Sequence, residues 1–355
     1  MNVTRLSAGS REPRTARPVN PSDPGPAHAD PVVSNPDRDW KKVRQLALRR
    51  LERFVSLEPK VLRGDDPDAI HDIRVASRRL QQVLDLLYPK SQPREIRRMR
   101  RRIRRCRRAF GNVRNYDVFL GHVDRYLSRK RISRREAWSA IQEYVRARRA
   151  GLFQKALRRF NRQNLTGLYV RLREHLRAAG TAAKAGSAAP DLDPSPEVVA
   201  RDFWPRLAQS LEQLWTAFEA QVSESRRNPC PTTIHGARIA AKRLRYLLEV
   251  VYEFRVRGCA DQLAWLRRLQ QHLGDWHDLE IQGQLLAGMV GRPAFLREHL
   301  ELGQEIMTLM RREQAGKKRY EDKYFLQVRD SLEWLRLNQW IAHLLASCSA
   351  SLAGA

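Results

Sequence analysis

Apolar side chains recur along this chain at the three- and four-residue spacing of amphipathic helices. In the segment 94–110 the apolar stripe consists of Ile96, Met99, Ile103, Cys106 and Phe110. The segment 70–86, IHDIRVASRRLQQVLDL, likewise gathers its apolar residues on one side of a helix. Runs that alternate apolar and polar residues between turn residues, as strands do, are absent from the sequence. The pattern therefore predicts an all-α fold.

Capping and turn residues predict where several of these helices begin and end. Asp66 before Pro67 is typical of a helix start, and the helix it opens runs to Leu87. Ser133 and Glu136 have the spacing of a capping box, which opens a long helix. Further boundaries are predicted at Gly111, at Thr232 or Thr233, at Phe254 and at Gly274.

Two stretches interrupt the helical pattern and divide the chain. Residues 1–38 hold seven of the 18 prolines and few large apolar side chains, which predicts a disordered tail. Residues 178–196 are rich in Ala, Gly, Ser and Pro and are typical of a linker. We therefore expect one helical bundle over residues 39–177 and a second over residues 197–345.

The net charge of +28 is distributed unevenly. Residues 1–38 carry a net +1, residues 39–180 a net +25, and residues 181–355 a net +2. A charge of this size indicates a polyanionic partner. No apolar run is long enough to span a membrane or to act as a secretory signal, so we expect no membrane association. The four cysteines form no CxxC pair, which suits a reducing cytoplasm and excludes a cysteine-based zinc site.

An internal repeat relates the two halves. The segment 70–86 aligns without gaps on IHGARIAAKRLRYLLEV, residues 234–250, with identical residues at seven positions. About forty residues later in each copy, GNVRNYDVFL (111–120) faces GDWHDLEIQG (274–283). Each copy is thus predicted to hold a basic helix, a second helix, a glycine turn and a third helix.

The repeated helix places basic residues on one narrow face in each copy. In the first copy this face holds His71, Arg74 and Arg78, with Arg79 beside it. In the second copy it holds His235, Arg238, Lys242 and Tyr246, flanked by Arg243 and Arg245. A solvated cationic surface would explain one such stripe. Repetition of the same basic positions favours anion binding instead.

The segment 94–108 holds ten arginines in fifteen residues and carries much of the surplus charge. Opposite its apolar stripe lie Arg97, Arg101, Arg104 and Arg108. So many guanidinium groups on one helix repel one another, and a polyanion would relieve that repulsion. Arginine suits phosphate because its planar fork donates two parallel hydrogen bonds.

Candidate catalytic and metal-binding residues are few. His71 and His235 occupy equivalent positions, but no HExxH motif or second histidine at helical spacing accompanies either one. A structural or phosphate-binding role is favoured over a metal site. Asp117, Asp275 and Asp278 lie near the glycine turns, where aspartate usually caps a helix. We predict no metal, no cofactor and no catalytic residue.

The chain resembles the CHAD family, the histidine-containing α-helical domain. The motifs that carry the resemblance are IHDIRVASRRLQQVL with FGNVRNYDVFL, and IHGARIAAKRLRYLLEV with LQQHLGDWHDLEI. The resemblance covers about residues 40–340 and departs from the family pattern at Asn115, His277 and Gln81. It implies an all-α fold of two four-helix bundles related by a pseudo-twofold axis, with a basic central cleft.

The resemblance also implies binding of inorganic polyphosphate and association with polyphosphate granules, which agrees with the cytoplasmic location that the cysteine usage suggests. The residues it carries over are His71, Arg74, Arg78, Arg79, Arg101, Arg104, Arg108, His235, Arg238, Lys242, Arg243 and Arg245, to which the basic stripe adds Tyr246. We expect binding without catalysis. One alternative is an RNA- or DNA-binding module, disfavoured because Tyr246 is the only aromatic residue in the stripes. A second is a metal- or phosphate-handling protein that uses the paired histidines. The oligomeric state stays open.

Overall fold

The computed structural model describes residues 36–64, 66–88, 94–130, 134–185, 203–329 and 331–353. These residues form helices joined by short connections, and no strand occurs among them. The predicted all-α fold is confirmed. None of the helices in these ranges combines the length and apolar character that crossing a membrane requires.

Seven helices of the first half are described. They are α1 (Pro36–Ser56), α2 (Glu58–Arg63), α3 (Pro67–Leu87), α4 (Arg94–Ala109), α5 (Gly111–Leu127), α6 (Arg135–Asn161) and α7 (Leu165–Ala185). Those of the second half are α9 (Phe203–Arg227), α10 (Pro231–Glu253), α11 (Cys259–Val290), α12 (Pro293–Glu298), α13 (Leu300–Arg329) and α14 (Leu332–Ala353).

The predicted tail and linker fall mostly outside these ranges. Of residues 1–38, only 36–38 are described, and they belong to α1. Of the predicted linker, residues 178–185 form the last turns of α7 and are helical, whereas residues 186–196 lie outside the described part of the chain.

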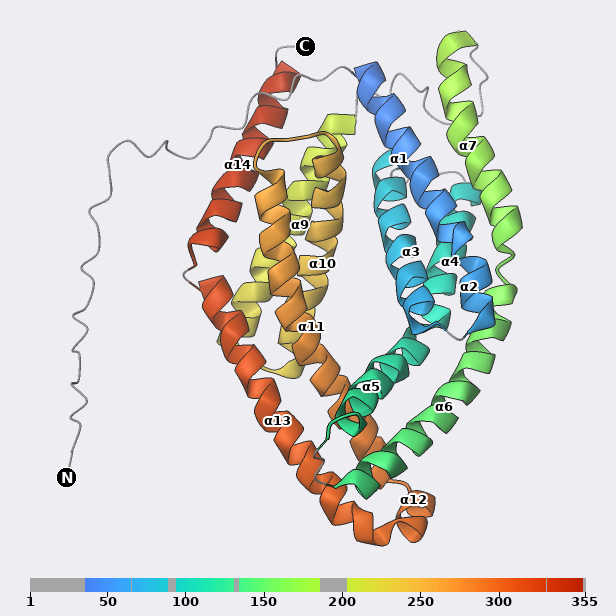
Figure 1. Cartoon of the computed structure of the whole chain (residues 1–355). Helices are drawn as coiled ribbons and strands as arrows, with labels where there is room; N and C mark the ends of the chain where they lie inside the picture. Colours follow the sequence, from blue (N-terminus) through green and yellow to red (C-terminus); the bar gives the residue numbers. More distant parts are fainter. Residues whose placement is uncertain are drawn as a thin grey trace, which may run out of the picture.

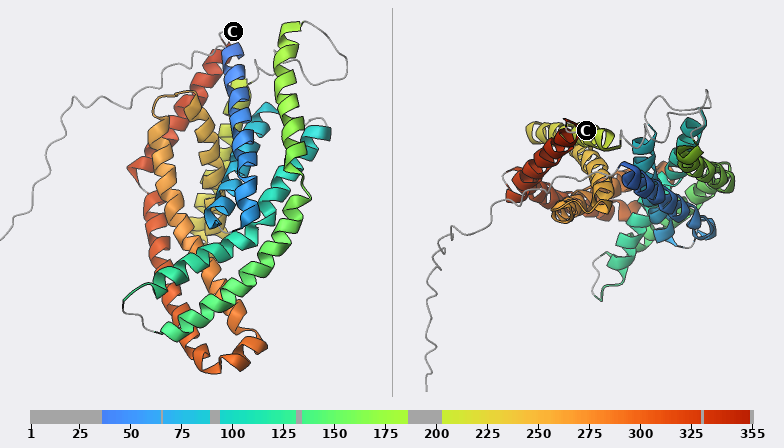
Figure 2. Two further views of the ribbon diagram at one scale, coloured as in Figure 1. Left: turned by 45° about the vertical axis from the view of Figure 1, so that its right-hand side comes forward. Right: turned by 90° about the horizontal axis from the view of Figure 1, so that it is seen from above.

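The two halves of the chain lie side by side. Figure 1 shows α1, α3, α4 and α7 on one side and α9, α10 and α14 on the other, and the view from above in Figure 2 shows the same division. At one end α1 and α3 pack against α9, and α3 also packs against α10. At the other end α5 packs against α11, and α6 against α13. The halves therefore meet at two places along their length.

Both repeated helices begin in a similar way. At α3 the Asp66 carboxylate accepts a hydrogen bond from the backbone N–H of Asp68 at 2.8 Å, and Pro67 fills the first helical position, as predicted. At α10 the residue at the cap is Cys230, not a threonine. The Thr233 hydroxyl accepts from the Cys230 backbone N–H at 3.2 Å, and Pro231 fills the first position. His71 and His235 are thus both fifth in their helices.

The prediction of a helix end at Gly274 is wrong. The helix α11 runs without interruption through that residue, whereas in the first copy Phe110 separates α4 from α5. A Cβ at Gly274 would meet no atom within 4 Å apart from the adjoining backbone of its own helix, so nothing there forces the chain to turn. Consequently Asp117, Asp275 and Asp278 lie inside helices and cap none of them.

Another predicted boundary lies partly outside the described residues. Ser133 is not among them, and α6 begins after Arg134, which has a left-handed backbone (φ 61°) and no capping hydrogen bond from its side chain. The helix itself spans Arg135–Asn161.

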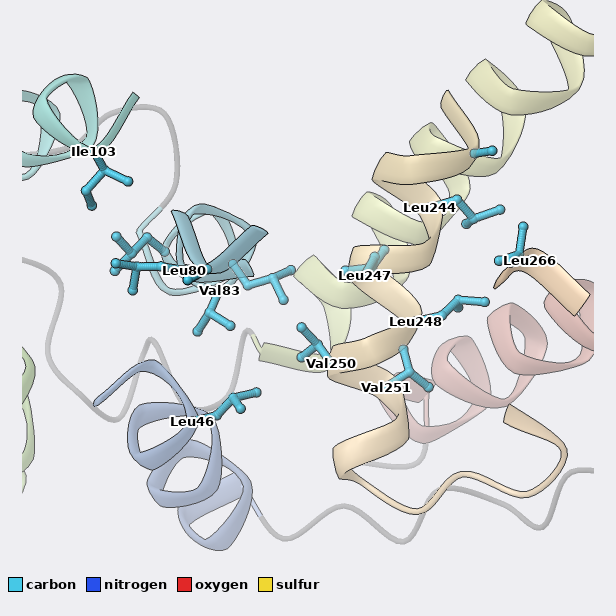
Figure 3. Close-up of a cluster of buried hydrophobic side chains, with 14 of the residues drawn as sticks. Leu46, Leu80, Val83, Ile103, Leu244, Leu247, Leu248, Val250, Val251 and Leu266 are labelled. Carbon is cyan, nitrogen blue, oxygen red and sulfur yellow. The ribbon is translucent and has the colours of Figure 1, made fainter. Parts of the chain in front are cut away.

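The two meeting places correspond to two apolar clusters. The larger cluster joins both halves, and Figure 3 shows Leu80 and Val83 of α3 near Leu247 and Val250 of α10. The smaller cluster gathers Phe119, Trp138, Leu286, Ile306 and others at the far end. Along α5 the larger cluster ends at Val113 and the smaller begins at Phe119. Along α11 the same change occurs between Trp276 and Leu286. On both helices, the polar residues between these positions therefore lie between the two apolar clusters.

Candidate functional site

The helix α3 presents His71, Arg74 and Arg78 away from its buried side. Ile73, Leu80 and Leu84 on the opposite side are fully buried, which fixes the rotation of the helix. Arg74 is half-buried and donates to the backbone carbonyl of Arg107 on α4 at 2.9 Å. Its burial and the neighbouring Arg78 lower its pKa to about 10.

The helix α10 brings a second pair of cations, Arg238 and Lys242, to the same place. Burial lowers the pKa of Arg238 to about 10 and holds that of Lys242 well below its usual range. Arg78 of α3 contributes to both shifts, so cations from the two halves of the chain lie near one another. The repeated basic faces are therefore parts of one site.

This site also includes two arginines that the sequence patterns did not single out. Arg107 of α4 donates to the Gln81 side chain at 2.8 Å, and burial together with Arg78 lowers its pKa to about 10. Arg114 of α5 is half-buried and adjoins His71 and Arg74, whose pKa values it lowers. We call the set of six the central cation cluster. It consists of Arg74, Arg78, Arg107, Arg114, Arg238 and Lys242.

Among the described residues, the central cation cluster has no carboxylate ion-pair partner. Within the described residues, none of its six members forms an ion pair with an aspartate or glutamate. The Nε atom of Arg238 is buried and has no hydrogen-bond partner there. Asp278 is close to Arg238 and Lys242, but burial raises its own pKa. Because buried cations are costly unless paired, a bound anion would lower the electrostatic cost of this cluster.

Three histidines lie at the edge of the cluster. The rings of His235 and His277 are 5.0 Å apart, and burial with Arg238 and Lys242 lowers the pKa of both, that of His277 to about 3. Desolvation and Arg114 also lower the pKa of His71, the most exposed of the three. Nowhere in the described chain do three or more metal-ligating side chains gather as a metal site would require.

Arg79, Arg245 and Tyr246 have a different environment. Glu249, which is 8% exposed, accepts hydrogen bonds from Arg79 at 2.7 and 3.1 Å and pairs with Arg245 at 3.5 Å. The Tyr246 ring is buried, and the Arg245 guanidinium lies 4.8 Å from its centre. These residues form a compensated ion network between α3 and α10.

The remaining predicted residues are on the surface. Arg101, Arg104 and Arg108 are exposed on α4, and Arg104 and Arg108 adjoin Arg107 of the central cation cluster. Arg243 is exposed on α10 and shares none of the interactions of the cluster.

A cavity of about 400 Å³ lies beside this network, between α1, α3, α10 and α11. Its carboxylates are all used by neighbouring arginines: Glu249 by Arg79, Asp72 by Arg53 at 2.7 Å, and Glu253 by Arg49 at 3.1 Å. These ion pairs distinguish its lining from the central cation cluster.

Comparison with known proteins identifies the family of this fold. A model of the CHAD domain family matches residues 45–287, a range that includes all the helices contributing to the central cation cluster. The chain belongs to the CHAD family. The predicted resemblance is thereby confirmed, and His71 and His235 stand in the repeated motifs of a CHAD domain.

Among solved structures, the crystal structure of the CHAD domain from the plant Ricinus communis is similar to this chain. The TM-score is 0.56 at 23% sequence identity, and the match covers 82% of this chain and 92% of the plant chain. At this identity the similarity shows a shared CHAD fold. None of the curated proteins matches the chain.

Proposed function

We propose that this CHAD protein binds inorganic polyphosphate in its central cation cluster, without catalysis. The observation that carries the proposal is that, within the part of the chain that the structure describes, the six half-buried cations of the cluster have no carboxylate ion-pair partner. Negatively charged oxygens would repay the cost of burying these cations, and the guanidinium forks match phosphate geometry. Polyphosphate supplies such oxygens along its whole length.

The surroundings of the cluster favour polyphosphate over RNA or DNA. Proteins that bind single-stranded nucleic acids commonly stack the bases on exposed aromatic rings. Tyr246, the aromatic residue of the repeated basic face, is buried beside Arg245 and offers no such platform. The competing hypothesis is that the protein binds nucleic acid. Displacement of polyphosphate by RNA at equal charge concentration would favour that hypothesis.

The proposed role is binding in the cytoplasm, at polyphosphate granules. All four cysteines are free thiols, which fits a reducing compartment. We expect no phosphate release from polyphosphate with Mg²⁺ or Mn²⁺ present. Metal-dependent turnover that is lost in a His71→Ala, His235→Ala variant would contradict the proposal.

The test is a variant with Arg78→Gln and Lys242→Gln. Neither side chain makes a hydrogen bond or ion pair in the described structure, so their replacement removes charge without removing support. We expect the Kd for long-chain polyphosphate to rise about tenfold or more at fixed salt. The melting temperature of the unliganded protein should rise, because repulsion within the cluster falls.

The matched control replaces two exposed cations of α13, Arg311→Gln and Arg319→Gln. It removes the same charge from side chains that share none of the interactions of the cluster, and it should leave the Kd nearly unchanged. Equal Kd values for the cluster variant and the wild type would overturn the proposal. Circular dichroism establishes that each variant keeps its helicity.

A further inference from the structure

The cavity of about 400 Å³ between α1, α3, α10 and α11 is separate from the central cation cluster. On α3, the residues that line the cavity are turned by roughly 120° from the face that holds Arg74 and Arg78. On α10, the lining begins seven residues beyond Lys242, which is a rise of about 10 Å. The cavity therefore has its own lining, to which both halves of the chain contribute.

The lining carries more positive than negative charge. It holds five arginines and three carboxylates, and each carboxylate pairs with one of the arginines. The other two arginines, Arg50 and Arg267, form no ion pair in the described part of the chain. The cavity thus has a surplus of two positive charges.

Arg50 is the more buried of these two arginines. It donates from Nη1 to the backbone carbonyl of Arg79 at 2.9 Å, which holds its side chain between α1 and α3. Burial lowers the pKa of Arg50 to about 10. A guanidinium has five N–H donors, so most of those of Arg50 are left for a ligand.

The same cavity also has an apolar part and an aromatic side chain. Leu46, Ala76 and Leu263 are buried in its lining, and Figure 3 shows Leu46 on the side of α1 that faces α10. Tyr252 of α10 lines the cavity and is 53% exposed, which places it at the mouth. A flat ring can pack on such a tyrosine, next to the apolar side chains.

These features match a small ligand and not a long polyanion. The volume is near the lower end of the range of small-molecule sites. A phosphate monoester carries a charge of about −1.5 to −2 at neutral pH, which is close to the surplus of the lining. A longer phosphate chain would bring more negative charge, and the three carboxylates of the cavity would repel it.

We propose that this cavity binds a small phosphate monoester that carries a flat ring, of the size of a nucleoside monophosphate. Arg50 and Arg267 supply the positive charge for its phosphate, and Tyr252 packs on its ring. The ligand touches both halves of the chain, so its binding stabilises the folded protein. This site uses none of the six cations of the central cation cluster and is independent of the proposed function.

The probe is adenosine monophosphate, compared with adenosine and inorganic phosphate by calorimetric titration of the full-length protein at fixed salt. We expect one site per chain for adenosine monophosphate, and at least about tenfold weaker binding of each partial probe. The melting temperature should rise with the concentration of adenosine monophosphate. No binding of this nucleotide, or equal binding of inorganic phosphate, would overturn the proposal.

Arg267→Gln removes one of the two surplus charges. Its matched control is Arg268→Gln, since Arg268 is the next residue of α11, is also exposed and does not line the cavity. We expect the Kd for adenosine monophosphate to rise about fivefold or more in Arg267→Gln, and by less than about twofold in Arg268→Gln. Equal effects would overturn the proposal, because general attraction to a basic surface would then explain the binding.

Two substitutions at Tyr252 test the packing of the ring. Tyr252→Ser should raise the Kd for adenosine monophosphate by about fivefold, whereas Tyr252→Phe keeps the ring and should leave it within about twofold of the wild type. The side chain is 53% exposed, so neither change threatens the fold. An unchanged Kd in Tyr252→Ser would contradict the assigned role of the ring.

The variant Arg78→Gln, Lys242→Gln separates this site from the central cation cluster. It should bind adenosine monophosphate as the wild type does, although its affinity for long-chain polyphosphate falls. If it loses the nucleotide while Arg267→Gln retains it, the nucleotide binds in the cluster and the inference is overturned, with the proposed function intact. If the wild type binds the nucleotide as expected but no polyphosphate, the proposed function fails and the cavity site stands.

Discussion

Neighbouring arginines in this protein have opposite electrostatic environments. Arg78 faces Arg238 and Lys242 and has no carboxylate partner in the described chain, whereas Arg79 is hydrogen-bonded to Glu249 at 2.7 Å. The rotation of about 100° between successive helical residues points one into the central cation cluster and the other into a compensated network. At the scale of residues, binding capacity is therefore set by the partner that each side chain meets.

Because three histidines lie at the edge of the cluster, we predict that polyphosphate binds more tightly as the pH falls. His71, His235 and His277 all have lowered pKa values in the free protein because of burial and neighbouring cations. A bound polyanion raises these values, so binding is accompanied by proton uptake. We expect the Kd to fall about tenfold between pH 8 and pH 6 at fixed ionic strength, which a titration in each buffer measures.

The variant His71→Gln, His235→Gln, His277→Gln should have a much flatter profile, and an unchanged profile would contradict the prediction. The charged groups that adjoin these rings are Asp72, Arg78, Arg114, Arg238 and Lys242. In the protein without ligand, these histidines affect folding stability in the opposite direction: stability, unlike binding, weakens as the pH falls. The unfolded chain, whose histidines titrate near pH 6.5, binds more protons than the folded one, so the free protein should lose stability as the pH falls through that value.

At the scale of elements, the two sequence copies are not built alike. The basic helices α3 and α10 match in their starts and in their basic faces, but α11 is continuous where the first copy is divided into α4 and α5. The break at Phe110 lies next to Arg107 and Arg114 in sequence, and both belong to the central cation cluster. In the divided copy, α4 and α5 thus each add one arginine to the two that α3 contributes.

Two glycine substitutions test the local backbone, one at Gly274 inside the continuous helix α11 and one at Gly64 before α3. Gly274→Ala should stabilise the protein by about 1 kcal/mol, because alanine favours the interior of the continuous helix α11 and its Cβ meets no neighbour. Gly64→Ala should destabilise it by about 2 kcal/mol, because Gly64 has a left-handed backbone (φ 77°) and Phe153 packs against it. Urea denaturation measures both changes. A loss of stability in Gly274→Ala would show that the chain turns there.

At the scale of the whole molecule, the halves are held together on both sides of the central cation cluster. The larger apolar cluster joins α3 to α10, and the smaller joins α5 and α6 to α11 and α13. Ion pairs add to the first contact, since Arg79 and Arg49 of the first half pair with Glu249 and Glu253 of α10. These contacts oppose the repulsion of the cations between them.

Glu249→Gln tests how much the buried ion pair contributes. We expect a loss of about 2 kcal/mol in unfolding free energy, because Glu249 is 8% exposed and its loss leaves Arg79 and Arg245 unneutralised. Long-chain polyphosphate should bind more tightly, because two further cations become available. Glu253→Gln is the control. Its pair with Arg49 is exposed (55% and 37%) and should cost less than about 1 kcal/mol. Equal losses in the two variants would contradict this assignment.

Much of the fold and part of the site follow from local patterns in the sequence. The apolar periodicity predicts the helices, Asp66 and Pro67 predict the start of α3, and the repeat predicts equivalent basic faces on α3 and α10. The prediction at Gly274 failed because a glycine permits a turn without requiring one. The pseudo-twofold relation of two four-helix bundles stays a prediction.

By itself, the sequence determined the all-α fold, the CHAD motifs and the faces on which the arginines lie, because helical periodicity is a local property of the chain. Only the tertiary structure decided which of those charges are free. Glu249 neutralises Arg79 across 170 positions of sequence, and Arg107 and Arg114 join a cluster built mainly on α3 and α10. Such pairings depend on how distant helices pack, and no local pattern encodes that.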